Sequence, residues 1–235
     1  MRYSCGFIYH EIIEYRKVGK DMLFTVLHGL SGQSVEEVTA SIVLLEEKIW
    51  KKSMQASPDV ILHRIKTYSD GLWRVKMDDD YAGYLFCIRL DERDILENHS
   101  WDSITDYGKI SKHTDNGNCI FGVSIGSAIP SVGSILMEHW TRAFDEDVYS
   151  GCERIYICSR IPSLSALEID KYNLSKDSEC VLRDRTVSLF MKYGFIPNNL
   201  IVDGYDLDEE SLGYSLLLYR NRMNKGTSDI INKLQ

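Results

Sequence analysis

One stretch, Cys119 to Phe144, constrains the fold of this chain more than any other. It reads CIFGVSIGSAIPSVGSILMEHWTRAF: a short apolar run, then small residues and a proline, then a helical pattern. A strand that leads into a helix through small residues leaves the first backbone N–H groups of the helix approachable. These groups and the helix dipole favour an anion. The stretch therefore predicts a strand–helix unit with an anion cradle, of the kind that suits the pyrophosphate of a nucleotide-like cofactor.

The composition is that of an ordinary globular protein. The chain has 235 residues, of which 44% are hydrophobic and 26% charged, which is enough for one core. Its formal net charge of -8 repels nucleic-acid phosphates, and no Lys/Arg cluster with interleaved aromatics offsets that charge. No apolar run approaches the ~18 residues of a membrane span, and the first residues lack the apolar core of a signal peptide. We expect a cytoplasmic protein that binds neither nucleic acid nor a membrane.

The metal-binding residue types show no ligand pattern. The six cysteines are scattered, none of them forms a CxxC pair or a Cys/His set with zinc spacing, and the six histidines are equally dispersed. The acidic run Asp78 to Asp80 stands alone between two strand-like segments, where a solvated hairpin turn is the usual structure. We therefore expect reduced, mostly buried thiols and no metal site.

Capping and turn signals predict the elements before the cradle. Ser34 is a candidate N-cap, with Glu37 as the return arm of a capping box, and apolar residues follow at helical spacing. Ser57 and Pro58 start a second helix, because serine caps well and proline suits the first turn. The remaining segments, in order, are strands at Met22–Leu27, Leu72–Met77 and Tyr81–Leu90 and a loop over 91–118.

The segments after the cradle complete an α/β pattern. They are a strand at Arg154–Ser159, an irregular stretch over 160–182, a helix at Asp184–Tyr193 ended by Gly194, and strands at Asn199–Val202 and Tyr214–Tyr219. Strands and helices in this order predict one α/β domain with a mixed sheet. We assign this domain to residues 21–221, with 1–20 as an N-terminal extension that pairs with a neighbour and 222–235 as a C-terminal tail.

Two short motifs carry a family resemblance. The segment LFMKYGF, Leu189 to Phe195, resembles the "FYxKxGF" helix end of the GNAT acyltransferase superfamily, and it follows the cradle by a strand and a helix as in that fold. The family's pyrophosphate loop, Q/R-x-x-G-x-G/A, is occupied here by AIPSVG, which keeps the last glycine as Gly133 but has Ala128 and Ser131 at the other two positions. The resemblance implies a mainly antiparallel mixed sheet flanked by helices.

The same resemblance implies acyl-CoA as co-substrate and assigns its contacts. Ser131, Val132, Gly133 and Ser134 would turn around the pyrophosphate. Val123, Ser124 and Ile125 would line the pantetheine arm. Backbone N–H groups of this strand would polarise the thioester oxygen, which requires no side chain.

A narrower resemblance covers most of residues 45 to 219. The runs EEKIW, ASPDVILHRI and YSDGLWRVKMDDDYAGYLFCIRL, and the tail YDLDEESLGYSLLLY, look like the GNAT-like domains of polyketide and related biosynthetic systems. Those domains transfer an acyl group to carrier-protein phosphopantetheine, and some decarboxylate a malonyl group first. Trp50 matches their functional Trp, and Ser159 matches their Thr. Their His falls at Phe190 and their Arg at Tyr205 or Asp206, so decarboxylation is not expected here.

The proton for the leaving thiolate has several candidate donors. The superfamily's usual Tyr is Phe190 in this chain, which leaves Tyr205, Tyr214 and Ser159 as candidates, each with a structural hydroxyl as the alternative. Trp50 is either a core aromatic or a wall of the acceptor tunnel. Cys158 is more simply a buried thiol than a nucleophile.

For several other polar side chains the sequence allows either a functional or a purely structural role. Arg160 could bind an anion or form a salt bridge. His139, on the helix after the cradle, is more simply a half-buried imidazole. The acidic loop Asp206 to Glu210 could attract a cationic amine or simply be solvated.

We expect direct transfer of an acyl group, acetyl or another short one, from acyl-CoA such as acetyl-CoA. The expected acceptor is a small-molecule amine or the phosphopantetheine thiol of a carrier protein, with a role in secondary metabolism. A catalytically silent module that binds CoA or a protein partner is the alternative, because the Tyr, His and Arg of the related enzymes are missing. The sequence predicts neither the acyl chain length nor the oligomeric state.

Overall fold

The structure is a computed structural model that describes residues 10–17, 20–98, 100–166, 174–201 and 208–223. Within these residues one sheet of eight strands forms the centre of the molecule, in the order β1-β2-β3-β4-β5-β6-β8-β7. Neighbouring strands are antiparallel except β5 and β6, which are parallel. The strands are β1 His10–Lys17, β2 Lys20–His28, β3 Leu72–Met77, β4 Asp80–Leu90, β5 Cys119–Ser127, β6 Arg154–Arg160, β7 Ile196–Ile201 and β8 Ser215–Asn221.

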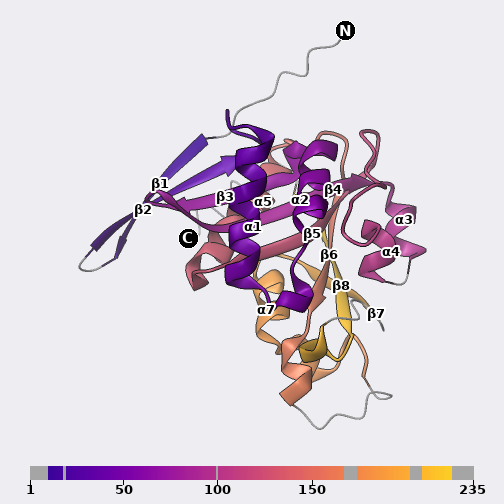
Figure 1. Ribbon diagram of the computed structural model, residues 1–235. Helices are drawn as coiled ribbons and strands as arrows, with labels where there is room; N and C mark the ends of the chain where they lie inside the picture. Colours follow the sequence, from indigo (N-terminus) through magenta and orange to yellow (C-terminus); the bar gives the residue numbers. More distant parts are fainter. Residues whose placement is uncertain (1–9, 18–19, 99, 167–173, 202–207, 224–235) are drawn as a thin grey trace.

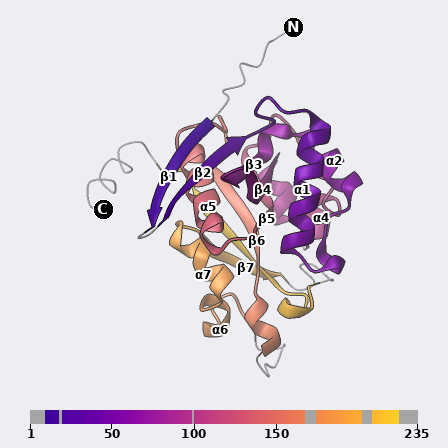
Figure 2. The same cartoon turned by 60° about the vertical axis from the view of Figure 1, so that its left-hand side comes forward.

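Helices cover both faces of this sheet (Figure 1). Figure 2 shows α1, α2 and α4 on one side of the strands and α5 and α7 on the other. The helices are α1 Val35–Ile49, α2 Pro58–Thr67, α3 Glu92–Leu96, α4 Trp101–Thr105, α5 Pro130–Asp145, α6 Glu179–Leu182 and α7 Arg185–Lys192, and the short 3-10 turns are η1 Lys52–Met54, η2 Ser69–Gly71, η3 Pro162–Ala166 and η5 Glu209–Ser211. This mixed, mainly antiparallel α/β arrangement confirms the predicted fold class.

The sheet has a hydrophobic core on each face because strand side chains alternate. Along β4, Leu85 and Cys87 pack with the α5 side, whereas Tyr84 and Phe86 pack with α1 and α2. Burial on both faces explains why the strand-like segments of the sequence read as continuous apolar runs and not as an alternation.

The strongest helix signals of the sequence are confirmed. Ser34 caps α1, its Oγ accepting from the Glu37 backbone N–H at 3.2 Å, while the Glu37 carboxylate accepts from the Ser34 N–H at 2.8 Å. Ser57 caps α2 with a single bond, its Oγ accepting from the Val60 backbone N–H at 3.3 Å, and Pro58 lies in the first turn. Gly194 follows α7 with φ +82°, the left-handed conformation that glycine adopts most readily.

Two loop predictions were wrong in part. Residues 91–118 contain α3 and α4, and 160–182 contain η3 and α6. These elements have five residues or fewer, too few for a periodic pattern to show, and their capping residues look like turn residues in a sequence.

The ends of the chain are described only in part. Of the predicted N-terminal extension, 10–17 form β1, which pairs with β2, while 1–9 and 18–19 lie outside the described residues. Of the predicted tail, 222 and 223 are described. The acidic run at 78–80 lies at the predicted hairpin turn between β3 and β4: Asp78, at φ +55°, and Asp79 form the turn, and Asp80 begins β4.

Candidate functional site

The two parallel strands of the sheet separate halfway along β5. Pairing runs from Cys119 opposite Arg154 to Gly122 opposite Ile157, after which β5 continues to Ser127 without β6 beside it. The backbone edges of both strands are therefore open beyond Gly122.

A β-bulge lies at the point where the strands separate. Phe86 of β4 pairs with Ser124, but the next residue, Cys87, pairs with Gly122, so Val123 is an extra residue in β5. A bulge bends its strand and re-aims the backbone groups around it. Trp101 of α4 holds this bulge in place, since its Nε1 donates to the Val123 carbonyl oxygen at 2.9 Å.

The gap opens into a cavity of about 610 Å³. Its walls come from α1, η1, α2 and α4 on one face of the sheet, from β5, β6 and β8, and from α7 on the other face, so the cavity reaches through the sheet between β5 and β6. Large apolar wall residues are Ile49, Trp50, Val60, Trp101, Ile157 and Phe190. A mostly apolar cavity with a few polar groups is the usual form of a small-molecule site.

A buried polar chain reaches the cavity from α1. The Tyr84 hydroxyl bonds to the Glu46 carboxylate and lies 2.9 Å from Ser124 Oγ. Trp50 Nε1 donates to the same Tyr84 hydroxyl at 3.4 Å. The other Glu46 oxygen accepts from the Ala56 backbone N–H at 2.6 Å. Burial raises the pKa of Glu46, and the Tyr84, Ala56 and Arg64 groups oppose that shift. Burial also raises the pKa of Tyr84 above its usual value.

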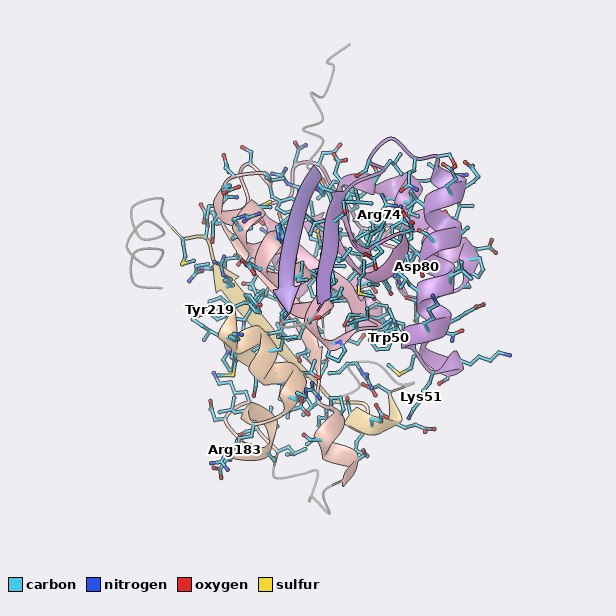
Figure 3. The ribbon with its side chains drawn as sticks, turned by 90° about the vertical axis from the view of Figure 1, so that its left-hand side faces the viewer. Trp50, Lys51, Arg74, Asp80, Arg183 and Tyr219 are labelled. Carbon is cyan, nitrogen blue, oxygen red and sulfur yellow. The ribbon has the colours of Figure 1, made fainter. Side chains whose placement is uncertain are left out.

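A salt-bridge cluster lies at another wall of the cavity. Arg160 Nε and Nη2 donate to the two Asp208 oxygens, both at 2.6 Å, and Nη2 also reaches Glu210 at 2.9 Å. Lys51 pairs with Glu210 at 2.8 Å, and the Arg160 guanidinium carbon lies 5.5 Å from the Trp50 ring centre. Figure 3 shows Trp50 and Lys51 together at the end of α1. The salt-bridge alternative for Arg160 is therefore the one observed.

The structure brings most of the sequence-predicted site residues to one place. The cavity wall includes Trp50, Val123, Ser124, Ile125, Ser159 and Tyr214. Ser159 Oγ donates to the Arg160 carbonyl oxygen at 2.9 Å, which is the structural alternative stated for this hydroxyl. Tyr205 lies outside the described residues.

The predicted pyrophosphate residues do not line this cavity; they lie in the first two turns of α5, next to the cavity-lining residue Ser127. Ser131 is exposed, Ser134 is half-buried, and Val132 and Gly133 are buried. The N-cap, Ile129, makes no side-chain cap hydrogen bond, unlike Ser34 at the start of α1. The Val132 N–H is already used, donating to the Ile129 carbonyl at 3.0 Å.

Two other residues named from the sequence have ordinary environments. Burial raises the pKa of the Cys158 thiol to about 12, so it is a neutral cavity-wall thiol at physiological pH. His139 on α5 is buried, deeper than the surface or half-buried position expected from the sequence, because α5 packs this side against the core; its Nδ1 lies 2.9 Å from Arg142 Nη2.

Three site residues escaped the sequence analysis: Glu46, Tyr84 and Trp101. For Glu46 a signal existed, because it stands four residues after Ile42 and so falls on the buried stripe of α1, where a carboxylate is costly. Tyr84 was not distinguishable in the sequence from the apolar residues around it in the strand-like segment. Trp101 was assigned to a loop, and only the fold shows that it reaches β5.

Neither a metal site nor a membrane span is seen in the part of the chain that the structure describes. No three His, Cys, Asp or Glu side chains there are grouped to hold a metal ion. No described helix is both long and apolar enough to cross a bilayer.

No protein-family model matches this sequence, and no curated protein matches it significantly. Several solved structures do match this chain. The loading GNATL domain of CurA from Lyngbya majuscula superposes with a TM-score of 0.69 at 16% identity, over 84% of this chain and 97% of that domain. The GphF GNAT-like decarboxylase in complex with isobutyryl-CoA gives a TM-score of 0.69 at 16% identity, over 83% of this chain and 98% of that one.

A more distant match is an acetyltransferase of the GNAT family from Streptococcus pneumoniae, with a TM-score of 0.50 at 10% identity over 85% of this chain and 99% of that one. At these identities the comparison concerns the fold alone. This chain therefore has the GNAT fold, in a form similar to the GNAT-like domains of CurA and GphF.

Proposed function

We propose that the protein is an acyl-CoA-dependent acyltransferase that transfers a short acyl group directly, without a covalent enzyme intermediate. The observation that carries this proposal is the open gap between β5 and β6 beyond Gly122, with the bulge at Val123 and the cavity behind it. An extended thioester arm fits such a gap, because the free edge of β5 offers backbone groups for pairing. We assign this activity to residues 21–221.

Direct transfer requires positioning and a polarised carbonyl. The thioester oxygen would accept hydrogen bonds from backbone N–H groups of Val123 to Ile125, which the bulge re-aims. The pyrophosphate would lie at the first turn of α5, Ser131 to Ser134, where the N-terminal end of a 16-residue helix favours an anion. The nucleophile attacks the carbonyl carbon, the C–S bond breaks, and CoA leaves as the thiol after taking a proton.

The acceptor would enter on the α1 and α2 side. The carrier-protein thiol is supported by the likeness to a loading domain, and a small amine by the likeness to acetyltransferases. The mostly apolar wall around Trp50 and Ile157 suits either the neutral arm of phosphopantetheine or an uncharged amine. A role in secondary metabolism follows if the acceptor is a carrier protein.

Calorimetry with CoA and a turnover assay test the proposal. The protein is mixed with acetyl-CoA, alone and with either a panel of amines or a holo carrier protein, and free thiol and acceptor mass are followed. We expect saturable CoA binding, and thiol release that needs one of the acceptors. Absence of CoA binding contradicts the enzyme proposal.

The second candidate is a silent module that binds CoA or a partner. One observation favours it: the Ser159 hydroxyl, which stands at the Thr position of related domains, is engaged with the Arg160 carbonyl. Binding of CoA without turnover on any acceptor would support this candidate.

A further inference from the structure

A carboxylate is buried on α1, in the cavity wall. Glu46 is 3% exposed, and its two oxygens accept from the Tyr84 hydroxyl and from the Ala56 backbone N–H. The charged group that faces it is Arg64 of α2, whose Nε donates at 2.5 Å to the Gly108 carbonyl oxygen. Burying a carboxylate costs free energy even when it is hydrogen-bonded, so apolar residues at this position would stabilise the core as well or better.

The direction of the hydrogen bonds between Glu46, Tyr84 and Ser124 follows from the number of protons that each group can donate. An ionised carboxylate only accepts, so Tyr84 must donate its one proton to Glu46. Its oxygen then accepts from Ser124, 2.9 Å away, and from Trp50 Nε1. The Ser124 oxygen therefore keeps its lone pairs for a donor in the cavity, whose wall it forms.

This series of hydrogen-bonded side chains ends where the acyl group would lie. Ser124 is the residue after the bulge residue Val123, at the open edge of β5. A nucleophile that attacks a carbonyl held by the backbone at Val123 to Ile125 would come within reach of Ser124 Oγ. The three polar side chains come from α1, β4 and β5, and they connect the buried carboxylate to this point in the cavity.

We propose that Glu46, Tyr84 and Ser124 form a proton relay that serves the acceptor nucleophile; this inference rests on the acyltransferase function proposed above. As the nucleophile forms its bond to the thioester carbon, its N–H or S–H proton passes to Ser124 Oγ, the Ser124 proton to Tyr84, and the Tyr84 proton to the Glu46 carboxylate. The C–S bond then breaks. The stored proton returns by the same path to the CoA thiolate, so acylated acceptor and CoA thiol are the only products.

The first test compares Glu46→Gln with Glu47→Gln, the neighbouring exposed residue of the same helix. A glutamine at 46 keeps the shape, but its amide nitrogen must donate where a carboxylate oxygen accepted, which stops proton transfer. We expect Glu46→Gln to lower kcat about 100-fold, within the usual range for acid–base groups, with the Kd of CoA and the KM of the acceptor changed less than about threefold. Glu47→Gln is expected to match the wild type.

The second test is the pH profile of kcat. Wild-type activity should rise with pH as Glu46 ionises, and this acidic limb should vanish in Glu46→Gln and reappear in Glu46→Asp. The titratable and charged groups facing Glu46 are Tyr84 and Arg64, neither of which changes charge at acidic pH. A purely structural role of Glu46 would alter Tm and leave the limb unchanged.

Tyr84→Phe keeps the proposal falsifiable if Glu46→Gln does not fold. It removes the middle hydroxyl and should lower kcat by a similar factor, and combining it with Ser124→Ala should add little, because one broken link already interrupts the relay. Normal CoA binding with kcat within about threefold of wild type in these variants overturns the relay alone. Loss of CoA binding in the wild type overturns the acyltransferase function itself.

Discussion

The indole nitrogen of Trp101 donates a hydrogen bond to the carbonyl oxygen of Val123, 2.9 Å away. Trp101 lies in the short helix α4, and Val123 is the extra residue of β5 at the point where the sheet opens. A side chain from outside the sheet thus holds the backbone that we propose to polarise the thioester. We expect the direction of the neighbouring N–H groups to depend on this contact.

Trp101→Phe should therefore weaken the site more than the fold. The variant keeps the aromatic ring but loses the hydrogen bond, which costs about 1 kcal/mol, and kcat should fall about fivefold. The matched control is Trp73→Phe, which loses a comparable bond to the Tyr149 hydroxyl at 2.7 Å, deep in the other core. Urea titrations and steady-state kinetics separate the two: the control should lose stability with kcat retained. Equal kinetic losses would contradict a role for Trp101 at the bulge.

A negative charge in the first turn of α5 should act oppositely on stability and on CoA binding. Ser131→Asp places a carboxylate near the helix N-terminus, which stabilises the helix by about 0.5 kcal/mol. The same charge repels a pyrophosphate, and we expect the Kd of CoA to rise about tenfold. Ser131→Asn, neutral and of equal size, is the control, and calorimetry and thermal melts are the measurements. If the Kd rises equally for pantetheine, which has no pyrophosphate, the cradle does not lie there.

Asp208 should make the protein more stable at neutral than at acidic pH. Burial by itself would raise the pKa of Asp208, but the hydrogen bonds from Arg160 and Ser211 outweigh burial and lower it. A carboxyl whose folded pKa is depressed contributes stability above its unfolded pKa, about 3.9, and that contribution is lost as pH falls through the folded value. Asp208→Asn should cost about 2 kcal/mol at pH 7 and flatten the acid limb of the unfolding free energy. Glu209→Gln, a change of an exposed neighbour, should do neither.

Cys158 should not carry the acyl group. Its pKa of about 12, raised by burial, leaves a neutral thiol at physiological pH, and thiols react as thiolates. Cys158→Ala is expected to keep kcat within about twofold, and intact mass after mixing with acetyl-CoA should show no acyl adduct on the wild type. An adduct that disappears in the alanine variant would establish a covalent route instead of direct transfer.

Local signals account for what could be predicted of the fold. Helix-capping signals act over a few residues and can therefore be recognised in the sequence. Examples are the Ser34 and Glu37 capping box, the Ser57 cap and the glycine after α7. The family motifs then ordered these elements into a GNAT-like sheet. The helices α3 and α4 were missed because neither spans two turns.

The candidate site could be predicted only in part from the sequence. Local patterns and family motifs were enough to predict the α/β class, the strand–helix unit from Cys119 to Phe144, and the strand positions Val123 to Ile125, which line the cavity. The sequence did not show that β5 separates from β6 after Gly122. Nor did it show that Glu46, Tyr84 and Ser124 meet, since up to 78 positions separate them in the chain. Strand pairing, bulges and buried polar contacts depend on partners that are distant in sequence, whereas helix caps and hydrophobic periodicity depend on residues a few positions away.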